Sequence, residues 1–131
     1  MKTVVLKFGG TSVGSIDRIK KVCKIIAFYK KKKNKVLVVS SAMSGVTNEL
    51  INKSKLISKN FDRAEYDSLV STGEQVSCSL IAGRLKHDGF KSRSWVSWQL
   101  PILTDGPHSG ARISSMSVKK LGSYIKSGGI P

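Results

Sequence analysis

Hydrophobic and polar residues recur with two different periods along the chain, and each period predicts a type of secondary structure. Two short runs, Thr3–Phe8 and Lys35–Ser41, are rich in β-branched and aliphatic residues. The second run is apolar at consecutive positions, which is typical of a strand covered on both faces. We therefore predict a β-strand in each run.

Between these strands, apolar residues recur every three or four positions, which is the period of an amphipathic helix. The apolar positions are Ile16, Ile19, Val22, Cys23, Ile26 and Tyr29. Charged residues occupy the other side, and Ser15 stands where a hydroxyl side chain would cap the helix. A strand, a helix and a second strand usually form a right-handed crossover with parallel strands. The pattern therefore predicts an α/β fold with a mainly parallel sheet.

Two further helices are predicted from the same period, at about Thr47–Ser58 and Ala64–Lys86. The apolar stripe of the longer helix is expected to be buried. It consists of Tyr66, Leu69, Val70, Val76, Leu80, Ile81 and Leu85. The sequence HDGF at His87–Phe90 should end this helix, because glycine favours the left-handed conformation that commonly follows a helix.

Shorter elements are predicted for the rest of the chain. Lys91–Trp98 is predicted as a strand. Leu100–Asp105 and Ala111–Ser114 are predicted as a pair of strands joined by the turn DGPHSG. Val118–Gly129 is predicted as a last helix that ends at glycine. No repeat or low-complexity linker divides the 131 residues, so we expect a single domain.

Composition changes this picture little. The hydrophobic fraction of 40% is enough for a core, and 23 lysines and arginines against 8 acids give a net charge of +15. A basic surface attracts nucleic acid, but much of the excess lies in one run, Tyr29–Lys35. Aromatic residues accompany this run only at one end, as Phe28 and Tyr29. Solvated surface charge is the preferred interpretation, and a small basic nucleic-acid-binding protein is an alternative.

The two cysteines and the absence of long apolar runs indicate the cellular setting. Cys23 and Cys78 lie far apart within predicted helices and lack metal-binding spacing, so we expect two reduced, buried thiols. The sequence contains no run of 18 apolar residues and no signal-peptide pattern. These features predict a cytoplasmic protein with no membrane partner and no metal site.

The segment Lys7–Ser15 joins the first strand to the first helix and holds the first candidate chemistry. In open α/β sheets, ligands bind at the carboxyl edge, where this segment lies. Gly9 and Gly10 would let the backbone approach a ligand closely, and N–H groups at a helix start attract anions such as phosphate. The spacing matches neither the P-loop nor the GxGxxG motif. A tight strand–helix turn beside a lysine is the alternative interpretation.

The second strand ends at the same edge in a segment rich in hydroxyl groups, SSAMSGVTN. Its hydroxyl residues are Ser40, Ser41, Ser44 and Thr47. A helix-capping segment is the alternative here. The loops that follow the two neighbouring strands are both rich in hydroxyl groups and glycine. Together they would nevertheless line one crevice with hydrogen-bond donors suited to phosphate.

The predicted long helix carries an acid among small residues, in the sequence STGEQVS. On helical spacing, Glu74 stacks with Val70 and Ser77, so it lies at the margin of the buried stripe. An acid in that position could bind the ammonium group of a ligand. A surface glutamate beside a packing glycine is the alternative.

Four segments, in this order, resemble the successive motifs of the aspartate kinases, which belong to the amino-acid kinase superfamily. They are KFGGTSV at 7–13, SSAMSGVTN at 40–48, STGEQVS at 71–77 and LTDGPHSGARI at 103–113. The resemblance covers essentially the whole chain. It implies phosphorylation of the β-carboxylate of L-aspartate by ATP, with Mg²⁺, to give 4-phospho-L-aspartate. This reaction is the first step towards lysine, threonine and methionine.

The resemblance also implies roles for individual residues. Lys7 is expected to be catalytic and to stabilise charge on the transferring phosphoryl group. Thr47 and Glu74 are expected to bind aspartate, with Glu74 meeting its α-amino group. The residues expected to contact the phosphates of ATP are Lys7, Phe8, Gly9, Gly10, Thr11, Ser12 and Ser41.

The fourth motif has two interpretations. Its residues Asp105, His108 and Arg112 could form part of the rim of an active site, or they could belong to a purely structural hairpin. We therefore assign them no catalytic role from the sequence.

At the level of the fold, the resemblance implies a mainly parallel sheet sandwiched between helices. Residues 1–131 would form the N-terminal part of an amino-acid kinase domain, without its nucleotide-binding remainder and without regulatory ACT domains. We therefore expect a chain that is inactive alone, from a protein that forms a homo-oligomer when complete. A degenerate kinase-like domain with only a binding role is the alternative.

Overall fold

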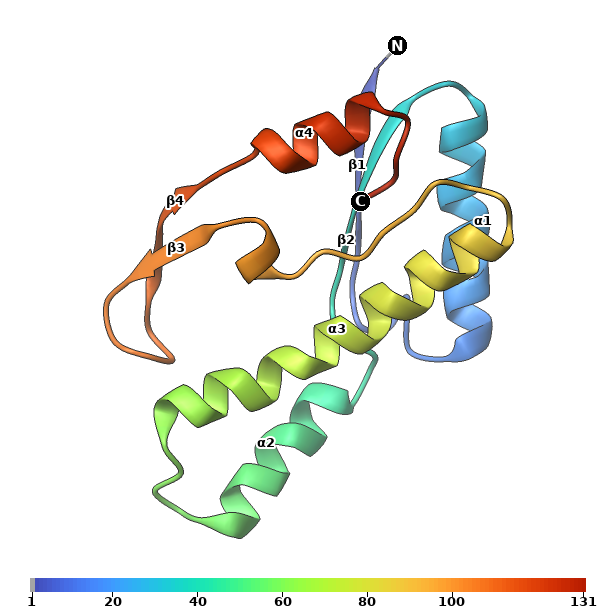
Figure 1. The fold of residues 1–131 in the computed structure, drawn as a ribbon. Coiled ribbons are helices and arrows are strands. Elements are labelled where there is room, and N and C mark those ends of the chain that lie inside the picture. Colours follow the sequence, from blue (N-terminus) through green and yellow to red (C-terminus); the bar gives the residue numbers. More distant parts are fainter. Residues whose placement is uncertain (1) are drawn as a thin grey trace.

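The computed structural model describes residues 2–131 and begins with a strand–helix–strand unit. Strand β1 spans Thr3–Phe8, helix α1 spans Ile16–Lys31 and strand β2 spans Lys35–Ser40. The two strands pair in parallel and in register along their whole length, and α1 packs beside them (Figure 1). The hydroxyl oxygen of Ser15 accepts a hydrogen bond from the N–H of Arg18 at 3.2 Å, as expected of an N-cap. The predicted crossover and its cap are confirmed.

Helices α2 (Val46–Ile57) and α3 (Arg63–His87) form an antiparallel pair at the carboxyl ends of the strands (Figure 1). Helix α3 ends at the predicted glycine, because Gly89 takes a positive φ of 84°. The N–H of Phe90 then donates to the carbonyl of Leu85 at 2.9 Å, which closes the last turn.

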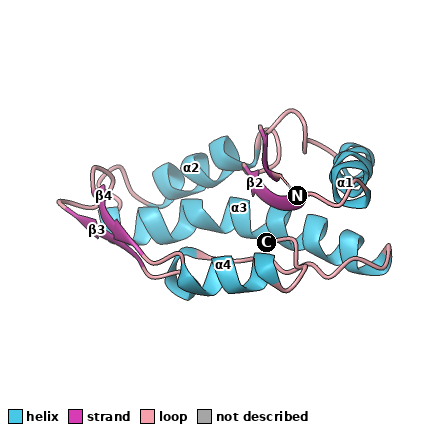
Figure 2. Cartoon of the chain, turned by 90° about the horizontal axis from the view of Figure 1, so that it is seen from above, coloured by secondary structure: helices cyan, strands magenta, loops and turns pink. Residues whose placement is uncertain are grey.

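The remaining elements lie on the other side of α3. A short 3-10 helix, η1 (Ser97–Gln99), leads into strands β3 (Ile102–Asp105) and β4 (Arg112–Met116), which form the predicted antiparallel hairpin. Helix α4 (Lys119–Lys126) follows. Seen from above, the hairpin projects at the end of the molecule opposite α1 (Figure 2). The two-stranded parallel sheet, the hairpin and the four α-helices confirm the α/β class.

The core lies between one face of the parallel sheet and helices α1 and α3. Its buried apolar residues are Val13, Ile19, Val22, Cys23, Ile26, Val36, Ile81, Leu85 and Ile130. The other sheet face is partly uncovered, because Val5 on β1 is 61% exposed and Val39 on β2 is 44% exposed. Among the described residues, no helix combines the length and the apolar composition that crossing a membrane requires.

The prediction of a strand at Lys91–Trp98 is wrong. Only Ser92 forms a β-bridge, with Ile130, and the chain then turns into η1. A strand requires a partner along its length, and the described chain supplies one only at Ile130.

The predicted buried stripe of α3 is also partly wrong. Val76 is 50% exposed and Leu80 is 38% exposed, whereas the small residues Gly73 and Ser77 are buried. The first half of α3 packs on α2 and the second half packs on α1 and β2, so the buried face is not a single straight stripe.

Candidate active site

The loops that follow β1 and β2 meet at the carboxyl edge of the sheet. The N–H of Ser41 donates to the carbonyl of Phe8 at 3.0 Å. A Cβ atom placed on Gly10 would lie 3.0 Å from the carbonyl oxygen of Ala42, and one on Gly14 would lie 3.1 Å from the Cβ of Ser44. The backbones of the two loops are therefore in close contact at this edge of the sheet.

Helix α3 brings its acid to the same edge. The N–H of Ala42 donates to Oε1 of Glu74 at 3.2 Å, and Glu74 is half-buried. This approach depends on the neighbouring glycine, because a Cβ on Gly73 would lie only 2.9 Å from the Cβ of Ala42. The structure thus joins the second and third sequence motifs by a direct hydrogen bond.

A buried hydroxyl network fixes the exit of β2. The hydroxyl of Ser77 donates to the carbonyl of Ser41 at 2.7 Å and lies 3.4 Å from the hydroxyl of Ser40. Ser77 is fully buried, although it is polar. Sequence reasoning assigned no role to this residue. Ser77 lies one helical turn after Glu74, and this spacing was the sequence signal that could have indicated its contact with the end of β2.

The glycine-containing loop after β1 is tied by backbone hydrogen bonds. The N–H of Ser12 donates to the carbonyl of Gly9 at 2.9 Å, and Nη1 of Arg18 donates to the carbonyl of Thr11 at 3.1 Å. A Cβ on Gly9 would meet no atom within 4 Å. Packing therefore does not require glycine at position 9, and the open space above it can admit a ligand.

The first two residues of the KFGGTSV motif point to opposite faces of β1. The ring of Phe8 packs against the core, which leaves its backbone for any contact with a ligand. The side chain of Lys7 is exposed on the face that carries Val39. Within residues 2–131, Lys7 has no carboxylate within ion-pair distance. Its ammonium group is therefore free to bind an anion.

Thr47 lies in the first turn of α2 and is half-buried. Its neighbour Val46 contacts the position of Gly73, where an added Cβ would lie 3.3 Å from Cγ1 of Val46. Gly45, with φ of 85°, makes the turn into α2 without a side-chain cap. Thr47 and Glu74 thus extend from two helices that touch beside the site.

The hairpin residues left unassigned by the sequence do not share in this network. Nδ1 of His108 lies 3.2 Å from the carboxylate of Asp67 on α3, and the N–H of Ser109 donates to the same carboxylate at 2.8 Å. The backbone hydrogen bond from Ser109 lowers the pKa of Asp67. Asp105 and Arg112 lie opposite each other in the backbone register of the exposed hairpin. These contacts favour the structural interpretation of the fourth motif.

The cysteines and acids of the described chain form no metal centre. Within residues 2–131, no three His, Cys, Asp or Glu side chains are grouped so that they could hold a metal ion. Both thiols are free, but only Cys23 is fully buried and Cys78 is half-buried, in contrast to the prediction of two buried thiols. Burial raises the pKa of Cys23 from 9.0 to about 11, and burial also raises the pKa of Cys78.

Known sequences resemble the chain over its whole length. The aspartokinase of Rickettsia conorii is 45% identical over 134 residues, which cover 100% of this chain and 33% of that protein. The aspartokinase of Geobacillus stearothermophilus is 43% identical over 130 residues, or 99% of this chain and 32% of that protein. The chain therefore spans about a third of the length of these relatives.

Solved structures of aspartate kinases and a family model also match the chain. The crystal structure of aspartate kinase from Synechocystis matches 99% of this chain and 21% of that chain, with a TM-score of 0.80 and 33% identity. E. coli aspartokinase III, solved with aspartate and ADP, shares the fold with a TM-score of 0.76 at 19% identity, over 99% of this chain and 40% of that chain. The model of the amino acid kinase family matches residues 2–131. The chain therefore belongs to the amino acid kinase family.

Proposed function

We propose that the protein is an aspartate kinase, which transfers the γ-phosphoryl group of ATP to the β-carboxylate of L-aspartate. The product would be 4-phospho-L-aspartate, for the synthesis of lysine, threonine and methionine. The observation that carries the proposal is the hydrogen bond from Ala42 to Glu74, which brings an acid to the loop between β2 and α2 at the carboxyl edge. The 45% identity to an aspartokinase supports the choice of substrate.

The loop after β1 is proposed to hold the phosphates. In-line phosphoryl transfer asks the protein mainly to position two reactants and to stabilise charge on the transferring group. Lys7 would supply that charge, and the backbone at Gly9 and Gly10 would approach the phosphate oxygens, with Thr11, Ser12 and Ser41 nearby. The open space above Gly9 supports this assignment. The attacking oxygen belongs to aspartate, so no nucleophilic side chain is needed.

Mg²⁺ is proposed to enter with the nucleotide, where it would neutralise phosphate charge. The described residues offer no acidic or histidine cluster to hold the ion. We therefore assign no magnesium ligand within residues 2–131.

Glu74 and Thr47 are proposed to bind aspartate. One carboxylate oxygen of Glu74 accepts the N–H of Ala42, and the other remains available for the α-ammonium group of aspartate. Thr47 lies in the first turn of α2, which packs on α3, the helix that carries Glu74. The structure of E. coli aspartokinase III with aspartate and ADP gives a precedent for both ligands in this fold.

The chain is proposed to be the N-terminal part of a kinase domain whose sheet extends beyond β2. The carbonyl of Pro131 accepts the N–H of Val38 at 3.0 Å, and the N–H of Ile130 donates to the carbonyl of Lys91 at 2.8 Å. These residues lie between β2 and the segment at Ser92, as a parallel strand would.

An apolar cavity of about 450 Å³ lies next to this junction, lined in part by Leu37, Val39 and Ile81. A continuing strand would fill it and give the mainly parallel sheet sandwiched between helices. The rest of the nucleotide site and any ACT domains would lie outside residues 1–131. We further propose a cytoplasmic, homo-oligomeric enzyme with no nucleic-acid or membrane partner.

The decisive experiment measures ADP formation that depends on aspartate and Mg²⁺. The protein would be full-length and carry this segment, for example residues 1–131 joined to the remaining part of the Rickettsia conorii aspartokinase. Lys7→Ala should lower kcat by about 10²-fold or more, because a preorganised charge is lost from the transition state. Residues 1–131 alone should release no ADP.

The fold serves as the control: within residues 2–131 the exposed side chain of Lys7 forms no ion pair, so the variant should keep its circular dichroism spectrum. A normal kcat with only a raised KM for aspartate would contradict the role of Lys7. Binding of aspartate by the full-length protein without any turnover would contradict the kinase function and support a degenerate binding domain.

A further inference from the structure

A second concave site lies between α4 and the segment that precedes the hairpin, and two of its lining residues, Arg93 and Trp95, also border cavities that Glu74 lines. We propose that this site binds a small anion that carries adjacent phosphate groups. The cavity has a volume of about 790 Å³, within the range of small-molecule sites. Its lining residues are Arg93, Trp95, Gln99, Lys119, Lys120, Ser123, Tyr124 and Ser127. Three of these are cations and none is an acid.

Aromatic rings hold one cation of the cavity, Arg93, in place. The guanidinium of Arg93 lies 4.5 Å from the centre of the Trp95 ring, and that ring meets Tyr124 edge to face at 5.5 Å. Nζ of Lys91, which is not a lining residue, donates to the hydroxyl of Ser127 at 2.9 Å and lies 5.6 Å from the Tyr124 ring. The Arg93 side chain, held against Trp95, therefore loses little further freedom when it binds an anion.

The positive charge of this cavity is not compensated within the described chain. Arg93, Lys119 and Lys120 form no ion pair within residues 2–131. From Gly89 onward the sequence holds a single acid, Asp105, which lies in the hairpin. An anion in the cavity would relieve the mutual repulsion of these cations.

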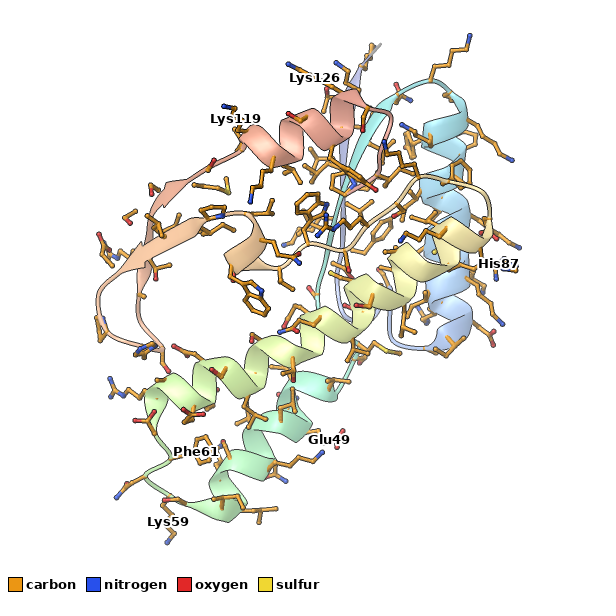
Figure 3. All side chains as sticks on the ribbon, viewed as in Figure 1. Glu49, Lys59, Phe61, His87, Lys119 and Lys126 are labelled. Atoms are coloured by element: carbon orange, nitrogen blue, oxygen red, sulfur yellow. The ribbon has the colours of Figure 1, made fainter. Side chains whose placement is uncertain are left out.

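The start of α4 adds further donors. Lys119 and Lys126 mark the two ends of this helix (Figure 3). Two lysines in the first turn are unfavourable for a helix, whose N-terminus already carries partial positive charge. No side chain caps this end, because Val118 occupies the N-cap position. The first-turn N–H groups therefore remain available to an anion together with the lysine ammonium groups.

The donor set favours phosphate over other anions. Arginine presents a planar set of N–H groups that matches two oxygens of one phosphate, and the two lysines can reach a second phosphate. The hydroxyls of Ser123 and Tyr124 add neutral donors. Such a ligand could be inorganic pyrophosphate or the diphosphate part of a nucleotide. This proposal does not depend on the kinase activity.

Trp95 provides a direct measurement, because it lines the cavity and the chain has only one other tryptophan, Trp98, which is 69% exposed. In the Trp98→Phe chain, the fluorescence of Trp95 should change saturably during titration with inorganic pyrophosphate at constant ionic strength. Combining this change with Lys119→Ala and Lys120→Ala should raise Kd by about tenfold or more, because charged hydrogen bonds are lost. Circular dichroism would verify that the variants remain folded.

Two control variants separate a site from general charge attraction. Lys24→Ala with Lys31→Ala removes two exposed lysines from α1 and should leave Kd unchanged. Lys59→Ala should also leave it unchanged, because Lys59 is exposed and lies outside the cavity. A parallel titration with ADP distinguishes a nucleotide ligand from an inorganic one. If ADP binds more tightly than pyrophosphate, the ligand is a nucleotide; if ADP binds equally or more weakly, the ligand is inorganic. No saturable change, or equal losses in the control variants, would overturn the proposal.

Discussion

At the scale of single residues, two glycines of the candidate active site are needed for different reasons. Gly73 is required by packing, since an added Cβ would lie 2.9 Å from the Cβ of Ala42. Gly9 is not, since an added Cβ would meet nothing within 4 Å. The same residue type thus serves the fold at one position and, in our proposal, a ligand at the other.

Alanine substitutions should separate these two roles. Gly73→Ala should destabilise residues 1–131 by about 1–3 kcal/mol in urea unfolding, as overpacking does. Gly9→Ala should leave stability nearly unchanged but raise KM for ATP in a full-length protein, because a methyl group would occupy the space proposed for phosphate. Equal stability losses in both variants would refute the distinction.

A second residue-scale prediction concerns the proposed contact of Glu74 with aspartate. In a full-length protein, Glu74→Gln should raise KM for aspartate by one to two powers of ten, or about 1.5–3 kcal/mol for a charged hydrogen bond. KM for ATP should change little. Glu65→Gln, in the exposed first turn of the same helix, is the matched control and should behave as the unchanged protein. A similar rise in both KM values would make Glu74 structural.

At the scale of elements, the β3–β4 hairpin is attached to the rest of the molecule at its tip. The carboxylate of Asp67 accepts the N–H and the hydroxyl of Ser109, at 2.8 and 3.0 Å, and faces His108. Every residue from Leu103 to Lys120 is exposed, and only Ile102 at the base of the hairpin is half-buried. One side chain of α3 therefore holds the fourth motif in position.

Removing this carboxylate should release the hairpin without unfolding the domain. Asp67→Ala should increase amide hydrogen exchange across Ile102–Met116 and leave α1 and β2 protected. Asp17→Ala, an exposed acid on α1, should not change exchange in the hairpin. Unchanged exchange in the Asp67 variant would show that the hairpin is held by its base alone.

At the scale of the whole molecule, Cys23 links the first helix to the centre of the core. Its side chain is fully buried, and its thiol lies 3.8 Å from the carbonyl of Ile81 on α3. Burial, followed by the charge of Asp88, raises its pKa from 9.0 to about 11. The folded chain therefore retains this proton in a pH range where the unfolded chain releases it.

This difference predicts that stability falls at high pH. A raised pKa means that the unfolded state loses its proton first, so the free energy of unfolding decreases between pH 9 and about pH 11. The thiol should contribute a slope of up to about 1.4 kcal/mol per pH unit. Urea unfolding of Cys23→Ala should show a smaller slope over this range. Parallel curves for both chains would show that the thiol does not contribute.

Elements whose signals are local can be predicted from the amino-acid sequence. The strand–helix–strand order, the cap at Ser15, the glycine ends of α3 and α4 and the hairpin were all predicted, because each depends on residues a few positions apart. The motif order also identified the family, which the match over residues 2–131 confirms. The roles of Lys7, Thr47 and the glycine loop stay predictions.

Features that depend on residues far apart in the chain could not be predicted in this way, because they arise from packing in the folded molecule. Lys91–Trp98 is not a regular strand, because its pairing depends on Ile130, some forty positions later. The exposure of Val76 and Leu80 depends on which elements α3 meets along its length. The contacts of Glu74 with Ala42, of Ser77 with Ser41 and of Asp67 with Ser109 join separate motifs. Periodicity reports the preferences of one segment, whereas these contacts arise only when packing brings several segments together.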